Sequence, residues 1–239
     1  LMIRRPPRST RKESSAASDV YKRQERLKQC IETSPLAALP AAKASPTQLP
    51  LQLCPGRHNI QVERLESARL LMIWSGAAAS DQCRVIGADL ATTLLGEGRR
   101  SRLVARLREE LQIAETVDMD LTSLEMGSLI TLEISCNPTH LDAVETCIQD
   151  QLTSVELFTP MELERGRQLV GNGLRYSLES SAQVASMAAS HRLWGREQTL
   201  LDPLTHLRSW SSERLQAELM QQLHPSRACT LIAIPGSRN

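Results

Sequence analysis

Two neighbouring segments near the middle of the chain, residues 116–124 and 128–135, alternate apolar and polar residues. In the second segment Ile130, Leu132 and Ile134 are separated by single residues, which is the two-residue period of a half-buried strand. Only three residues connect the two segments. The pattern therefore predicts a β-hairpin.

Two further strands are expected, a long strand or hairpin arm over residues 61–75 and a short apolar strand over Cys229–Ile234. The remaining segments repeat apolar residues every three or four positions, which predicts helices. These segments are residues 82–96, 101–111, 139–157, 160–179, 182–193 and 204–223. Asp81 is expected to cap the first helix and Gly96 to end it. Thr159-Pro160-Met161-Glu162 combines an N-cap, a first-turn proline and a capping-box glutamate.

This order of elements predicts an α+β domain over residues 61–239, with a mainly antiparallel sheet covered by helices on one face. Residues 25–60 are expected to contain the tail of a helix, Glu25–Ser34, and then a linker. Proline at this density favours an extended, semi-rigid linker. The linker prolines are Pro35, Pro40, Pro46, Pro50 and Pro55. A linker at the start of a domain implies that further protein lies upstream.

Residues 1–24 resemble the translation of sequencing-adapter read-through; as protein they would form a disordered basic arm. Such an arm would suit a transit peptide or nucleic-acid binding. The chain has 28 basic and 27 acidic residues, of which seven and two lie in residues 1–24. The rest of the chain is therefore mildly acidic, which argues against a nucleic-acid partner.

No apolar run reaches the roughly 18–20 residues that span a bilayer, so no membrane span is predicted. The six cysteines are scattered and form no Cys-x-x-Cys pair. We expect most of them to be small buried hydrophobes in a reducing compartment such as the cytoplasm, with a periplasm or an organelle as alternatives.

The sequence offers no metal-binding motif. Hydrolytic zinc needs three protein ligands and an open position for water, and a helix presents two histidines on one face when they are three or four residues apart. The two closest of the five histidines, His191 and His206, are 15 positions apart, and no His-x-x-Glu-His occurs. Neither a phosphate-binding glycine loop nor a Gly-x-Ser-x-Gly motif is present. No catalytic or metal-binding residue is predicted in this chain.

Three segments carry a resemblance to a known family: LLGEGRRSRLVARLREEL, PMELERGRQLV with SLESSAQVA, and LHPSRACTLIAIPG. Over residues 65–236 the chain resembles the carboxyl-side half-domain of pitrilysin/insulinase zinc peptidases. That family pairs two homologous halves into a clamshell, often as two subunits. The resemblance implies that zinc lies in a missing half or in a partner subunit, and that this half closes the chamber around a peptide substrate.

The resemblance also implies an arginine followed seven residues later by a tyrosine, both directed at the bound peptide. The arginine corresponds to Arg108, and Glu115 occupies the tyrosine position. A tyrosine hydroxyl can donate to a developing oxyanion, whereas an ionised carboxylate only accepts hydrogen bonds and repels negative charge. The expected substrate-binding residue is therefore Arg108, with a doubtful role for Glu115.

Several functions remain open from the sequence. The chain could be the rear piece of a subunit whose front half carried zinc, or a subunit without metal that partners an active one. It could instead be a structural scaffold, like the peptidase-like core subunits of a respiratory complex. Catalysis is not expected from this chain alone, and metalloendopeptidase activity is expected only with a zinc-bearing half or partner.

Overall fold

The computed structural model describes residues 11–39, 51–196 and 199–236. The chain forms two units, Leu1–Gln48 and Leu49–Asn239. The first contains one long helix, α1 (Arg11–Glu32), and a short 3-10 helix, η1 (Pro35–Ala38).

Helix α1 begins earlier than the helix tail expected from Glu25. It includes residues 11–24, for which the sequence suggested an artefact or a disordered arm. No proline or glycine occurs between Arg11 and Glu32, so nothing in the sequence interrupts the helix before Pro35. Residues 1–10 and the linker over residues 40–50 lie outside the described residues.

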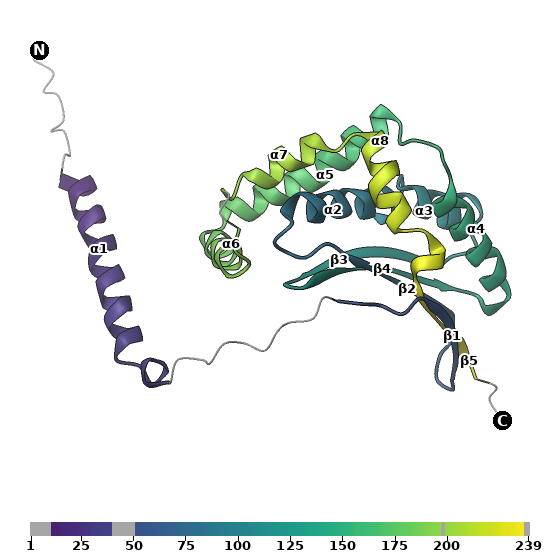
Figure 1. Cartoon of the computed structure of the whole chain (residues 1–239), viewed down its shortest axis with the longest axis horizontal. Helices are drawn as coiled ribbons and strands as arrows, with labels where there is room; N and C mark the ends of the chain where they lie inside the picture. Colours follow the sequence, from purple (N-terminus) through teal and green to yellow (C-terminus); the bar gives the residue numbers. More distant parts are fainter. Residues whose placement is uncertain (1–10, 40–50, 197–198, 237–239) are drawn as a thin grey trace, which may run out of the picture. The chain divides into compact units, whose positions relative to one another are not determined.

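The second unit is built on a five-stranded sheet with the order β1-β5-β2-β4-β3 (Figure 1). Its strands are β1 (Gly56–Val62), β2 (Ala68–Gly76), β3 (Thr116–Leu124), β4 (Gly127–Cys136) and β5 (Cys229–Pro235). β1 pairs with β5 in parallel, and every other neighbouring pair is antiparallel. The predicted α+β fold with a mainly antiparallel sheet is confirmed.

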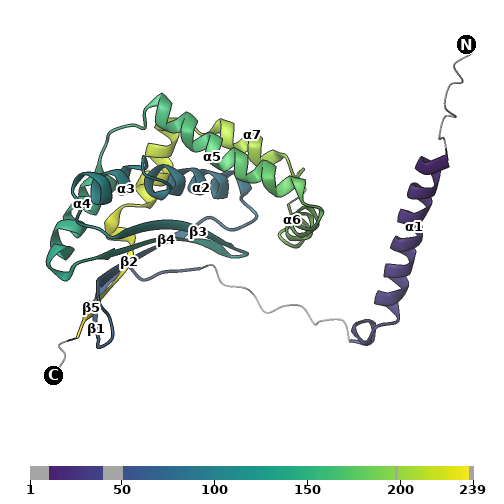
Figure 2. The ribbon, with the colours of Figure 1, turned by 180° about the vertical axis from the view of Figure 1, so that it is seen from behind.

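Helices cover one face of this sheet (Figures 1 and 2). They are α2 (Gln82–Gly96), α3 (Arg102–Val104), η2 (Ala105–Glu110), η3 (Pro138–His140), α4 (Leu141–Thr153), α5 (Pro160–Glu179), α6 (Ser181–Leu193), α7 (Asp202–Ser209), α8 (Ser212–Arg214), η4 (Leu215–Met220) and η5 (Pro225–Arg227). α2 is buried around most of its circumference because it contacts β3 as well as α5 and α7.

The core forms between the sheet and the helices. Alternate residues of β2 are buried, and the register places Leu70 between Ile134 of β4 and Ile232 of β5, all three at most 1% exposed. Trp74, further along β2, is also buried, and its Nε1 donates to the carbonyl of His224 at 3.1 Å. Hydrophobic burial on one face of β2, β3, β4 and β5 therefore fixes the register of these strands, whereas β1 is exposed along its whole length.

The local capping predictions are confirmed. Thr159 Oγ1 accepts from the Glu162 N–H at 3.2 Å, and Glu162 Oε2 accepts from the Thr159 N–H at 2.7 Å, which completes the capping box of α5. Asp81 Oδ1 accepts from the Arg84 N–H at 3.1 Å at the start of α2, and that helix ends at Gly96 as predicted.

The prediction of one strand or hairpin arm over residues 61–75 is wrong. β1 and β2 are separate strands, and β5 lies between them and pairs with both. β1 also begins at Gly56, inside the predicted linker. The partner strand comes from the far end of the domain, so the local apolar pattern contains no signal for it.

The predicted helix over residues 204–223 is interrupted. α7 ends at Ser209, and Trp210 adopts an extended backbone conformation before α8 begins. The Trp210 ring packs so closely on Gly87 of α2 that a Cβ there would lie 2.2 Å from ring carbons, and its Nε1 donates to the Cys83 carbonyl at 2.9 Å. The free energy gained by burying this indole outweighs the free energy lost where the helix is interrupted.

Candidate functional site

Arg108 lies on η2, a π-helical turn that continues from α3. Beyond it the chain turns through Gln112, whose φ of 54° lies in the left-handed region, and then enters β3. The Arg108 side chain is 53% exposed, and its Nε lies 4.0 Å from Glu109 Oε1. An exposed ion pair of this length contributes little to stability. The guanidinium is therefore available to a ligand.

Glu115 lies directly before β3 and is held by two serine hydroxyls. Ser67 Oγ donates to both carboxylate oxygens, at 3.1 and 2.9 Å, and Ser135 Oγ donates to Oε2 at 3.0 Å. Its backbone N–H also donates to the Ser135 carbonyl at 2.8 Å. Burial, and secondly the charge of Glu115, raise the pKa of the Cys136 thiol. Sequence reasoning missed both serines, because Ser67 lies 48 positions away in the chain.

Glu115 faces a shallow depression of about 630 Å³ on the uncovered side of the sheet. Its lining includes Ser67, Arg69, Asp118 and Glu133. The strand register places Arg69, Asp118 and Glu133 on the face opposite the buried residues, and Arg69 Nη1 forms an ion pair with Glu133 Oε1 at 2.7 Å. The Glu115 carboxylate therefore belongs to the face of the sheet that this unit's helices leave open.

The two predicted site residues keep separate partners. Arg108 contacts Glu109, whereas Glu115 contacts Ser67 and Ser135. Within the parts of the chain that the structure describes, no hydrogen bond or ion pair joins Arg108 to Glu115.

Arg102, the arginine of the Ser-Arg-Leu sequence, has a structural role that the sequence did not reveal. Its Nε and Nη2 donate to the Glu162 carboxylate at 2.9 and 3.2 Å, and its Nη1 and Nη2 donate to the carbonyls of Glu156 and Leu157 at 3.0 and 2.8 Å. The guanidinium also lies 4.2 Å from the centre of the Phe158 ring. Burial raises the pKa of Glu162, but hydrogen bonds from Arg102 and Thr159 outweigh it and lower that pKa to about 2. Arg102 thus fastens α3 to the start of α5.

The described residues include no arrangement of ligands suited to a zinc ion. Among residues 11–39, 51–196 and 199–236, no group of three or more His, Cys, Asp or Glu side chains is arranged to hold a metal. His191 is buried beside Gln82, with 3.3 Å between its Nε2 and the Gln82 Nε2. Burial, and secondly Arg196, lower the pKa of His191, which favours the neutral form of this buried histidine.

The cysteines and the helices add two observations. All six cysteines are free thiols, but only Cys136 and Cys147 are buried, so the prediction that most of them are buried is wrong. No helix among the described residues is both long enough and apolar enough to cross a bilayer.

Comparison with known proteins agrees with this arrangement. A family model described as "Peptidase M16 inactive domain" matches residues 23–170. The uncharacterised zinc protease YmxG of Bacillus subtilis (strain 168) is 24% identical over 175 residues, which cover 72% of this chain and 42% of YmxG. The chain thus spans less than half the length of this relative.

Solved structures share the fold. The peptidase M16 inactive domain from Pseudomonas fluorescens has a TM-score of 0.69 at 18% identity, covering 85% of this chain and 49% of that one. A chain of complex III2 from Candida albicans, with Inz-5 bound, has a TM-score of 0.68 at 15% identity, covering 87% and 52% respectively. At these identities the likeness shows the fold alone.

The sheet with helices on one face is the fold of M16 peptidase domains, and the described residues contain no group arranged to hold a metal. Because the family match extends over more than half of the chain, the chain belongs to the Peptidase M16 inactive domain family, a part of the M16 (insulinase) family of zinc proteases.

Proposed function

We propose that this chain is the non-catalytic half of an M16 metallopeptidase, which closes the peptide-binding chamber opposite a zinc-bearing half or partner subunit. The observation that carries the proposal is an M16 inactive domain whose described residues contain no group able to hold zinc. Inactive domains of this family pair with catalytic halves. Zinc and the general base then belong to the partner, and this half contributes peptide contacts.

Arg108 is the residue expected to contact the peptide. Its guanidinium carries several N–H donors, and among the described residues it is held only by a long ion pair to Glu109. It can therefore bind a peptide carbonyl or carboxylate at little cost to the fold. Glu115 offers only acceptor oxygens, and Ser67 and Ser135 already donate to them. Glu115 therefore cannot stabilise an oxyanion as a tyrosine hydroxyl would.

The first experiment measures zinc content and peptide hydrolysis for the full chain, alone and mixed with an M16 subunit that carries the zinc motif. Alone, the chain is expected to bind no stoichiometric zinc and to cleave nothing. The mixture is expected to form a stable complex that hydrolyses peptides. One equivalent of tightly bound zinc in the isolated chain would overturn the proposal.

Substitutions then test the residues. Arg108→Ala is expected to leave the melting temperature unchanged and to lower peptide turnover by the complex. Arg100→Ala, on the same exposed basic segment, is the matched control and should leave turnover unchanged. Glu115→Tyr restores a phenolic donor at the family's position and is expected to raise turnover. If Arg108→Ala and Arg100→Ala behave alike, Arg108 is an ordinary surface charge.

The alternative function, a structural scaffold subunit, predicts a different outcome when the chain is mixed with a zinc-bearing M16 subunit. A scaffold subunit would assemble stoichiometrically with its partner, yet neither Arg108→Ala nor Glu115→Tyr would alter any turnover. The likeness to a chain of complex III2 concerns the fold and does not favour this alternative over the peptidase role.

A further inference from the structure

A second concave surface lies away from Arg108 and Glu115, at the carboxyl end of β2. It is a pocket of about 390 Å³, and three other elements complete it: the first turn of α2, the helical segment that includes η4, and η5. Its lining includes Trp74, Arg84, Glu218, Gln222 and Arg227. Residues far apart in the sequence therefore converge on one site.

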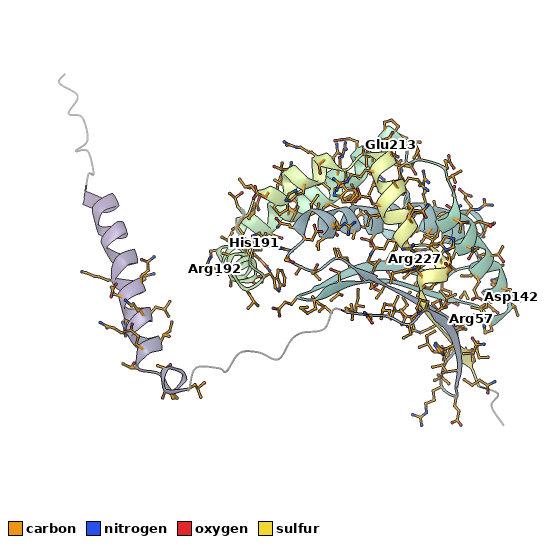
Figure 3. The ribbon with its side chains drawn as sticks, viewed as in Figure 1. Arg57, Asp142, His191, Arg192, Glu213 and Arg227 are labelled. Carbon is orange, nitrogen blue, oxygen red and sulfur yellow. The ribbon has the colours of Figure 1, made fainter. Side chains whose placement is uncertain are left out.

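Two arginines give this pocket its charge. Arg84 comes from the first turn of α2, and Arg227 ends η5, where the chain enters β5 (Figure 3). In the portion of the chain that the structure describes, neither guanidinium has a carboxylate within ion-pair distance. Two exposed guanidinium groups therefore line one pocket without a counter-charge of their own.

The one carboxylate in the lining is already neutralised. Glu218 Oε1 accepts from Arg214 Nε at 2.8 Å, and the Arg214 guanidinium lies 3.9 Å from the centre of the Trp210 ring, which fixes its orientation. The nearby Asp81 carboxylate accepts the Arg84 backbone N–H and serves as the N-cap of α2. The net charge of the lining is therefore positive.

The backbone carbonyls at the rim are also engaged. Gln222 Nε2 donates to the Ser75 carbonyl at 2.5 Å, and Ser128 Oγ donates to the Ala77 carbonyl at 2.6 Å. These acceptors would otherwise repel an anion. With these two carbonyls occupied, the guanidinium groups of Arg84 and Arg227 are the charged donors of the lining that remain for a ligand.

We propose that this pocket binds an oxyanion, the phosphate or carboxylate group of a small molecule, between Arg84 and Arg227. Planar guanidinium groups bind both kinds of oxyanion through paired, charge-assisted hydrogen bonds. The proposal does not depend on the peptidase role, because none of these residues belongs to the Arg108 or Glu115 surroundings.

The test uses the full chain with inorganic phosphate and malonate as probes, and sodium chloride at equal ionic strength as the blank. Calorimetric titration and thermal unfolding are measured for the wild type, Arg84→Gln, Arg227→Gln and the double variant. Arg192→Gln is the control, because Arg192 is an exposed arginine on α6 at the other end of the helical layer (Figure 3).

Binding of at least one probe is expected to exceed the chloride blank and to weaken about tenfold for each arginine removed, while Arg192→Gln binds like the wild type. Preference for phosphate would identify a phosphorylated ligand, and preference for malonate a carboxylated one. Binding no stronger than the chloride blank would overturn the proposal, as would equal binding by the double variant. Far-UV circular dichroism verifies that each variant is folded.

Discussion

Replacing Arg102 with alanine tests how much of the fold depends on the arginine of the Ser-Arg-Leu sequence. The side chain is 14% exposed, and that of its partner Glu162 is 23% exposed. The substitution removes four hydrogen bonds and the contact with Phe158, and it leaves the Glu162 carboxylate without its cation. Removing one partner of a fully buried ion pair costs about 3–5 kcal/mol. Because this pair is partly exposed, we expect a loss of about 3 kcal/mol.

Urea unfolding measures this loss. With an m-value of about 2 kcal/mol/M, the midpoint of Arg102→Ala should fall by about 1.5 M, with little change in m. The control is Arg106→Ala, which removes an exposed ion pair to Glu110 at 2.7 Å on the same helical segment. That variant should lose about 0.5 kcal/mol or less. Equal midpoints for the two variants would refute the structural role of Arg102.

The pH dependence of the free energy of unfolding tests the ion pair between Arg102 and Glu162 independently. The pKa of Glu162 falls from an ordinary value of 4.5 to about 2 in the folded state. The unfolded chain therefore binds this proton more readily than the folded chain, so the stabilisation is complete above pH 4.5 and is lost as the pH falls towards 2. The stability difference between wild type and Arg102→Ala should accordingly shrink across this interval. A difference that stays constant from neutral pH to pH 2 would contradict the assignment.

Three further substitutions test the packing of glycines on α2 and α5 and the buried charge on α2. Gly87→Ala places a methyl group 2.2 Å from carbons of the Trp210 ring and should lower the free energy of unfolding by about 2–3 kcal/mol. Gly173→Ala, in open space on α5, should instead raise the free energy of unfolding by about 0.5–1 kcal/mol. Urea unfolding measures both changes. Burial, and secondly Glu97, raise the pKa of Asp89 to about 6, so this carboxylate destabilises the fold progressively as the pH rises from about 4 through 6. Asp89→Asn should therefore raise the melting temperature at pH 7 and leave it nearly unchanged at pH 4; a lower melting temperature at pH 7 would contradict this.

Interactions between residues close together in the sequence made much of the fold predictable. The capping box at Thr159 and Glu162 formed as expected because both partners lie within one helical turn. The hairpin of β3 and β4 followed from alternation and a short connection, which are properties of neighbouring residues. In both cases the interactions that decide the structure lie within a few residues of each other.

Long-range contacts account for what the sequence could not predict. The break at Trp210 depends on Gly87, and the position of β1 depends on β5. For the candidate site, Arg108 and Glu115 were named from a family resemblance, and their roles stay predictions. The serines that hold Glu115 could not be found, because no spacing rule relates Ser67 or Ser135 to it.

The position of β5 has a consequence for how the domain is made. This strand is the last of the five in the chain, yet it lies inside the sheet and separates β1 from β2. During synthesis β2, β3 and β4 can pair early, whereas β1 has no neighbour until residues 229–235 leave the ribosome. Until then the chain exposes an unpaired edge of β2, which other extended chains can bind. Contacts of such long sequence separation also slow folding. A ribosome paused before β5 would therefore hold a half-built sheet that is prone to aggregate, and a chaperone that shields strand edges would act on this protein at that stage.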